Sequence, residues 1–151
     1  MAISFPPGLT FRRSGLMGAG VQMLGSIIGL GFWYIEMKKS AAEGPTGAAL
    51  GLALGIIFFG LIFLSGGVAI FLAALGYKMP TGVRDGLVIG YSALNFGFFG
   101  IFIMMMLSLD PVVLAVLFLI LVMANMGPVG LIVGMIAEKS RPSDQSRYPS
   151  P

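Results

Sequence analysis

Residues able to perform acid–base, nucleophilic or metal chemistry are scarce in this sequence. The chain of 151 residues contains neither cysteine nor histidine, which excludes disulfides, thiolate nucleophiles, haem ligation by imidazole and the usual zinc sites. Two ionisable side chains at most, Glu36 and Asp110, fall within its long apolar stretches, and both lie at an edge. Transporters of protons or cations normally keep a charged side chain deep in the hydrocarbon. The sequence therefore predicts a membrane scaffold that is not an enzyme.

The two carboxylates and the methionines all have structural explanations. Asp110 directly precedes Pro111, an arrangement typical of an N-cap followed by a first-turn proline, so we expect capping in preference to ion binding. Glu36 is followed by Lys38 and Lys39, which indicates a charged cluster at the membrane surface. Methionines gather at 104–106, 123 and 126; thioethers can bind Cu(I), but without Cys or His we interpret them as packing. No cofactor or metal site is predicted.

Composition predicts an all-α integral membrane protein. Hydrophobic residues make up 57% of the chain and charged residues 10%, and the mean hydropathy is +0.97, which is too apolar for a soluble globule. Four stretches are long enough to span a bilayer, at about 15–35, 47–75, 86–107 and 111–137. We expect a glycine-rich four-helix transmembrane bundle over residues 15–137. A polar N-terminal segment (1–14) and a Pro/Ser-rich tail (138–151) flank it, and Ser14, Thr46 and Gly76 are the expected helix caps.

The distribution of basic residues predicts the orientation. Most of them flank the first span at its start, the connection between the second and third spans, and the end of the fourth: Arg12, Arg13, Lys78, Arg84, Lys139, Arg141 and Arg147. Since basic residues accumulate on the cytoplasmic side, both termini are expected there. We expect a prokaryotic plasma membrane or an organellar inner membrane. The net charge of +3 is explained by topology, and no nucleic-acid partner is predicted.

Glycine is the next informative feature, with 23 residues. Many recur at three-, four- and seven-residue steps, which lets helix backbones approach closely in lipid. The predicted packing seams, in order of the four spans, are Gly18, Gly25 and Gly29; Gly47, Gly51 and Gly55; Gly86, Gly90 and Gly97; Gly127, Gly130 and Gly134. Such seams indicate close helix contacts, either within one bundle or with another chain.

Each predicted span also carries one neutral polar residue at a broadly similar depth. Gln22, Ser65, Asn95 and Asn125 fall roughly 10 to 20 Å from the cytoplasmic edge at 1.5 Å per residue. We expect interhelical hydrogen bonds among them. The alternative is a polar pocket for a quinone headgroup, a lipid or a small solute.

Helical geometry favours an outside partner. At 100° per residue, Asn95 lies about 160° from Gly97, and Asn125 lies about 160° from Gly127. If the glycine seams dock on one side, the amides need cover on the other. Pro128 removes an amide donor, so a kink is expected around residues 125–127.

These observations favour a noncatalytic accessory or structural subunit of a larger membrane complex, such as an energy-converting one. Its expected partners are membrane lipids and other integral membrane subunits. The first alternative is a homo-oligomeric channel or carrier for a neutral or weakly polar solute. A third class is a lipid- or quinone-binding membrane module that uses the polar layer as a closed pocket.

Overall fold

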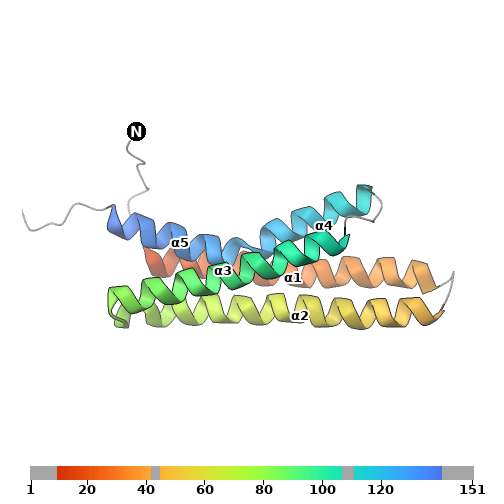
Figure 1. Ribbon diagram of the computed structural model, residues 1–151, viewed down its shortest axis with the longest axis horizontal. Helices are drawn as coiled ribbons and strands as arrows, with labels where there is room; N and C mark the ends of the chain where they lie inside the picture. The colour runs from red at the N-terminus through yellow and green to blue at the C-terminus, as the bar shows by residue number, and fades with distance from the viewer. Residues whose placement is uncertain (1–9, 42–44, 107–110, 141–151) are drawn as a thin grey trace, which may run out of the picture.

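The computed structural model describes residues 10–41, 45–106 and 111–140, and over these residues the protein is all-helical. The elements in chain order are α1 (Phe11–Ala41), α2 (Pro45–Leu75), the 3-10 helix η1 (Gly76–Lys78), α3 (Thr81–Met106), α4 (Pro111–Ala124) and α5 (Met126–Lys139). The helices run roughly along the longest axis of the molecule (Figure 1). Helices α1 and α2 are antiparallel and lie side by side along nearly their whole length.

The predicted number of four spans is not supported. Over the described residues, two helical stretches are long and apolar enough to cross a membrane, Phe11–Ala41 and Ala49–Leu75, with mean hydropathies of 1.5 and 2.6. The pair Val113–Ala124 and Met126–Lys139 would be a third span if its two parts cross together. Helix α3 is not among the spans found over the described residues. A membrane-embedded all-α fold with two or three spans therefore replaces the prediction of four.

The break in the last predicted span lies at Asn125, where the axes of its two parts differ by 41°. Pro128 has no amide hydrogen, so the carbonyl of Ala124 loses the donor that an unbroken helix would supply. The Asn125 amide lies within 3.2 Å of both the Leu121 and the Val122 carbonyl oxygens, which is the tightened geometry of a helix end. Residues 111–137 thus form two helices, with the break at the predicted kink.

The first helix begins earlier than predicted. Thr10 caps α1, because its Oγ1 accepts a hydrogen bond from the Arg13 amide at 3.2 Å. The prediction of Ser14 as the N-cap is wrong: Ser14 is buried inside α1, and its hydroxyl donates to the Gly130 carbonyl at 2.6 Å. Helix α2 likewise begins at Pro45, before Thr46, while its end at Leu75 agrees with Gly76 as the predicted stop.

Two apolar clusters form the core, one toward each end of the molecule. The first consists of Phe58, Phe59, Ile62, Phe99, Leu117, Ile120, Leu121 and Ala124. The second consists of Phe11, Ala19, Ala69, Leu72, Ala73, Val88, Leu131 and Met135. In α2, α3 and the α4–α5 pair, the residues between the two clusters include Ser65, Asn95 and Asn125. These polar residues therefore lie between the two apolar clusters.

Helix packing is uneven. Helix α1 packs most extensively against α2 and next against α5, whereas α3 makes few contacts with α2, α4 or α5. Gly18 and Gly130 mark the closest approach of α1 and α5: a Cβ on Gly18 would lie 3.1 Å from the Gly130 Cα, and a Cβ on Gly130 would lie 2.5 Å from the Ser14 carbonyl oxygen. Only glycine permits this approach. The bundle is therefore tight around α1 and loose around α3.

Candidate functional site

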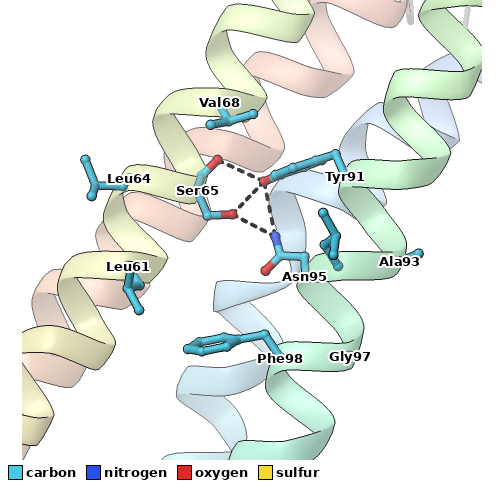
Figure 2. A pocket seen from close by; sticks show the side chains of 10 residues that line it. Leu61, Leu64, Ser65, Val68, Tyr91, Ala93, Asn95, Gly97 and Phe98 are labelled. Atoms are coloured by element: carbon cyan, nitrogen blue, oxygen red, sulfur yellow. Dashed lines mark hydrogen bonds between the residues drawn. The ribbon is translucent and has the colours of Figure 1, made fainter.

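Three of the four predicted polar residues lie in one hydrogen-bonded network, together with Tyr91. The Asn95 amide nitrogen donates to Ser65 Oγ at 2.8 Å and to the Tyr91 hydroxyl at 3.2 Å. The Tyr91 hydroxyl in turn lies 2.9 Å from Ser65 Oγ and donates to the Ser65 carbonyl oxygen at 2.9 Å. Figure 2 shows this triangle of side chains bridging α2 and α3. We call Ser65, Tyr91 and Asn95 the polar triad.

Gln22 of α1 joins the triad only weakly. The Tyr91 hydroxyl lies 3.5 Å from Gln22 Oε1, which is at the limit of hydrogen bonding. Gln22 is fully buried, and its amide nitrogen donates to the Ile62 carbonyl oxygen on α2 at 3.2 Å. Its principal role is therefore to tie α1 to α2.

Asn125 is not part of this network. Its amide nitrogen donates to the Leu121 carbonyl oxygen of its own helix at 2.8 Å. Its Oδ1 is buried and has no hydrogen-bond partner among the described residues. The predicted layer thus separates into a connected group on α1, α2 and α3 and an isolated amide at the α4–α5 break.

Tyr91 was missed by sequence reasoning, although a signal for it exists. It precedes Asn95 by four residues, so the two side chains occupy the same face of α3. Tyr91 had no place in the predicted layer because that layer took one neutral polar residue from each span, and Asn95 represented this one. Its hydroxyl contacts both other members of the triad.

An open groove lies beside the triad, between α2 and α3. Its volume is about 670 Å³, which is within the usual range for ligand sites. Its walls are mainly apolar and come from both helices: Leu61, Leu64, Ser65 and Val68 of α2, and Tyr91, Ala93, Leu94, Asn95, Gly97 and Phe98 of α3. The triad supplies the polar part of an otherwise apolar lining (Figure 2). The sparse contact between α2 and α3 leaves this space open.

The predicted glycine seams divide into occupied and unoccupied ones. Those of α1, α2 and α5 meet neighbouring atoms at the position where a Cβ would stand: Gly18, Gly25, Gly29, Gly51, Gly55, Gly127, Gly130 and Gly134. Gly47 lies in α2. The seam of α3 is different, because a Cβ at Gly86, Gly90 or Gly97 would meet nothing within 4 Å.

A cluster of charged side chains joins the N-terminal ends of α1 and α3 to the C-terminal end of α5. Arg84 Nη1 donates to Glu138 Oε2 at 2.7 Å, and Lys139 Nζ lies 2.7 Å from Asp85 Oδ2. The other oxygen of Glu138 accepts the Phe11 amide at 3.0 Å, which satisfies a free donor in the first turn of α1. We call Arg84, Asp85, Glu138 and Lys139 the charged clamp.

Within the clamp, Asp85 precedes the apolar part of α3. The pKa of Asp85 lies below its ordinary value of 3.8, chiefly because Lys139 donates a hydrogen bond to its carboxylate and also because Arg84 donates a further one. Partial burial opposes this shift. The two carboxylates singled out in the sequence, Glu36 and Asp110, do not belong to the clamp. Glu36 pairs with Lys39 at 2.7 Å on the exposed side of α1, and Asp110 lies outside the described residues.

The described residues include no group of three or more Asp and Glu side chains that could hold a metal ion. The described residues show hydrogen bonding at the triad and ion pairing at the clamp. Comparisons of this chain with protein-family models, with curated proteins and with solved structures find no match.

Proposed function

We propose that this protein is a noncatalytic accessory subunit that associates with another integral membrane protein through helix α3. The carrying observation is a continuous row of small, exposed residues along that helix: Gly82, Gly86, Gly90, Ala93, Gly97 and Gly100. At 100° per residue they fall within a sector of about 80° and extend over about 27 Å. We call this row the α3 small-residue face.

Exposure of this face to lipid alone has no structural benefit. Glycine inside a helix costs about 1 kcal/mol relative to alanine, and five glycines of this face would meet nothing within 4 Å if they carried a Cβ. In lipid, small residues are useful where a second helix approaches and regains dispersion contacts. The protein already uses glycine in this way where α1 crosses α5 at Gly18 and Gly130.

The shape of the face supports a partner other than a second copy. Large exposed side chains border it on both sides, Leu87 and Leu94 along one edge and Ile89 and Phe96 along the other. The face is therefore lower than the two rows of large side chains that border it. Helices pack by placing a row of large side chains of one against a low row of the other, and a second α3 would offer another low row. A helix with a row of large apolar side chains fits better.

The experiment that tests this proposal compares two glycine-to-leucine variants of the full-length tagged protein. Gly86→Leu fills the α3 small-residue face, whereas Gly20→Leu adds the same side chain at an exposed position of α1 where nothing lies within 4 Å. After gentle solubilisation, mass spectrometry identifies the membrane proteins that remain attached.

We expect an unrelated membrane subunit to copurify with the unmodified protein and with Gly20→Leu, and to be reduced at least several-fold with Gly86→Leu. Recovery of a self-assembly without other subunits would favour the homo-oligomeric channel or carrier instead. Equal recovery of the partner with both variants would remove the support from α3.

A further inference from the structure

We propose that the groove between α2 and α3 binds a membrane-dissolved apolar molecule through a hydroxyl group, and that it prefers a quinol to the corresponding quinone. The inference goes beyond the accessory role, because the groove takes its other wall from α2 and its polar groups from the triad; Ala93 and Gly97 belong both to its lining and to the α3 small-residue face. It depends on counting which hydrogen-bonding groups of the polar triad are already used.

Every donor of the triad has an acceptor within the protein. The two hydrogens of the Asn95 amide nitrogen point to Ser65 Oγ and to the Tyr91 hydroxyl. The Tyr91 hydroxyl has acceptors at the Ser65 carbonyl oxygen at 2.9 Å and at Gln22 Oε1 at 3.5 Å. The Ser65 hydroxyl has an acceptor in the Tyr91 oxygen across their 2.9 Å contact. A ligand carbonyl would therefore have to compete with acceptors of the protein for any donor of the triad.

One strong acceptor is left over. The Asn95 side-chain oxygen accepts no hydrogen bond from the described residues, although Asn95 as a whole is only 7% exposed. In Figure 2 this oxygen points away from the two hydroxyl groups, on the side of the groove where Leu61 and Phe98 lie. An accessible carbonyl oxygen with apolar neighbours gains a hydrogen bond when a ligand supplies a donor. The position therefore favours a ligand that brings its own donor.

The rest of the groove indicates what body that donor is attached to. The lining beyond the triad consists of Leu61, Leu64, Val68, Leu94 and Phe98 together with two small residues. Such walls match a ring or chain without charge. Asn95 is near the middle of α3, well away from both of its ends. A ligand whose ester or phosphate groups must stay at the membrane surface would not reach it, whereas a quinol can dissolve at that depth.

The redox pair provides a matched test of the hydrogen-bond count. A quinol and its quinone have nearly the same shape, but the quinol presents hydroxyl donors and the quinone only carbonyl acceptors. The quinol hydroxyl would donate to Asn95 Oδ1. The quinone carbonyl would instead face that oxygen with no donor between them. One net hydrogen bond corresponds to a roughly 2- to 10-fold difference in Kd.

The experiment uses the purified full-length protein in nanodiscs, with empty nanodiscs as the blank. Binding of a radiolabelled decyl-substituted benzoquinol is measured under reducing, anaerobic conditions, and binding of the corresponding benzoquinone is measured without reductant. The dimethyl ether of the same quinol retains the ring and lacks both hydroxyl hydrogens. We expect the quinol to bind roughly 2- to 10-fold more tightly than either the quinone or the ether.

Two variants assign the binding to this groove. Asn95→Leu removes the acceptor and should abolish the preference for quinol. Because Asn95 is buried and its loss could disturb folding, Leu64→Trp provides an independent variant. Leu64 is 67% exposed and lines the groove from the α2 side. Leu64→Trp should weaken quinol binding at least several-fold, whereas Leu24→Trp, at a 53% exposed position on α1 outside the groove, should not.

A quinone or an ether that binds as tightly as the quinol would overturn the assignment, as would equal effects of Leu64→Trp and Leu24→Trp. A competition experiment distinguishes a quinol from a lipid as the molecule that carries the hydroxyl. A diacylglycerol and an unlabelled quinol are each titrated against the radiolabelled quinol. Displacement at lower concentration by the quinol supports the proposal, and more effective displacement by the diacylglycerol contradicts it. Failure here leaves the partner role of α3 intact, because that role is tested at Gly86.

Discussion

Arg84 and Glu138 are joined by a 2.7 Å hydrogen bond between Nη1 and Oε2, although 54 residues separate them in the chain. The Arg84 side chain is only 8% exposed, and its guanidinium carbon also lies 4.7 Å from the centre of the Phe11 ring. The pair fastens the start of α3 to the end of α5. Because α3 contacts the remaining helices sparsely, this pair and the neighbouring Lys139–Asp85 pair have a large share in holding α3 in place.

The first prediction concerns this attachment. Glu138→Ala removes the partner of Arg84 and the acceptor of the Phe11 amide, so we expect a loss of about 1–3 kcal/mol in stability. Glu36→Ala is the control, since Glu36 forms an exposed pair with Lys39 that is worth well under about 1 kcal/mol. Thermal unfolding in detergent measures both, and equal midpoints for the two variants would show that the clamp is not structural.

The second prediction is a pH dependence of the clamp. The lowered pKa of Asp85, caused chiefly by Lys139, means that the folded state binds this proton less readily than the unfolded state does. Asp85 therefore contributes stability above its unfolded pKa, and this contribution is lost as pH falls through the lower folded pKa.

Unfolding midpoints between pH 5 and roughly pH 2 measure this contribution. Asp85→Asn should reduce the acid sensitivity of the protein, since an amide does not titrate over that range. An acid limb of the stability curve that is unchanged by Asp85→Asn would assign the acid sensitivity to other carboxylates.

The third prediction concerns the crossing of α1 and α5. Gly18→Leu should destabilise the protein by about 1–3 kcal/mol or prevent folding, because the added side chain would collide with the backbone of α5 near Met126 and Gly130. Gly20→Leu, two residues along the same helix and open to its surroundings, should have little effect. The comparison is made by unfolding in detergent, and similar stability of both variants would contradict the close contact.

The fourth prediction concerns the bend at Asn125. Pro128→Ala restores an amide hydrogen that the Ala124 carbonyl can accept, so α4 and α5 should straighten relative to the 41° bend. Spin labels on exposed Leu119 and Ile136 report the distance between the two helices. A longer label-to-label distance in Pro128→Ala is expected, and an unchanged distance would assign the bend to the packing around Pro128, which is buried.

Periodicity and composition predicted the helical, membrane-embedded class and the position of the bend, because both follow from local chemistry. Apolar length identifies a helix that can cross lipid, and Pro128 identifies the break. The number of spans differed from the prediction because α3 is not among the spans found over the described residues, and because the last stretch is two helices. Helix ends also differed, since Thr10 rather than Ser14 caps α1.

The polar layer was predicted in part for a related reason. Depth along each helix brought Gln22, Ser65 and Asn95 to a common level, but depth does not state which way a side chain points or what it meets. Tyr91 entered the network through its position four residues before Asn95, while Asn125 turned back to its own helix at Leu121. The charged clamp depends on contacts between residues more than 50 positions apart, such as Arg84 and Glu138. A local sequence pattern does not predict such contacts.

The most direct test of the central claim, that α3 is the surface for another membrane protein, is site-specific photocrosslinking in native membranes. The chain has no cysteine, so Gly90→Cys on the α3 small-residue face and Gly20→Cys on α1 can each be labelled with the same photoreactive group. We predict that Gly90→Cys yields a discrete adduct with one unrelated membrane protein, while Gly20→Cys yields only lipid adducts. Lipid adducts alone at both positions would contradict the account.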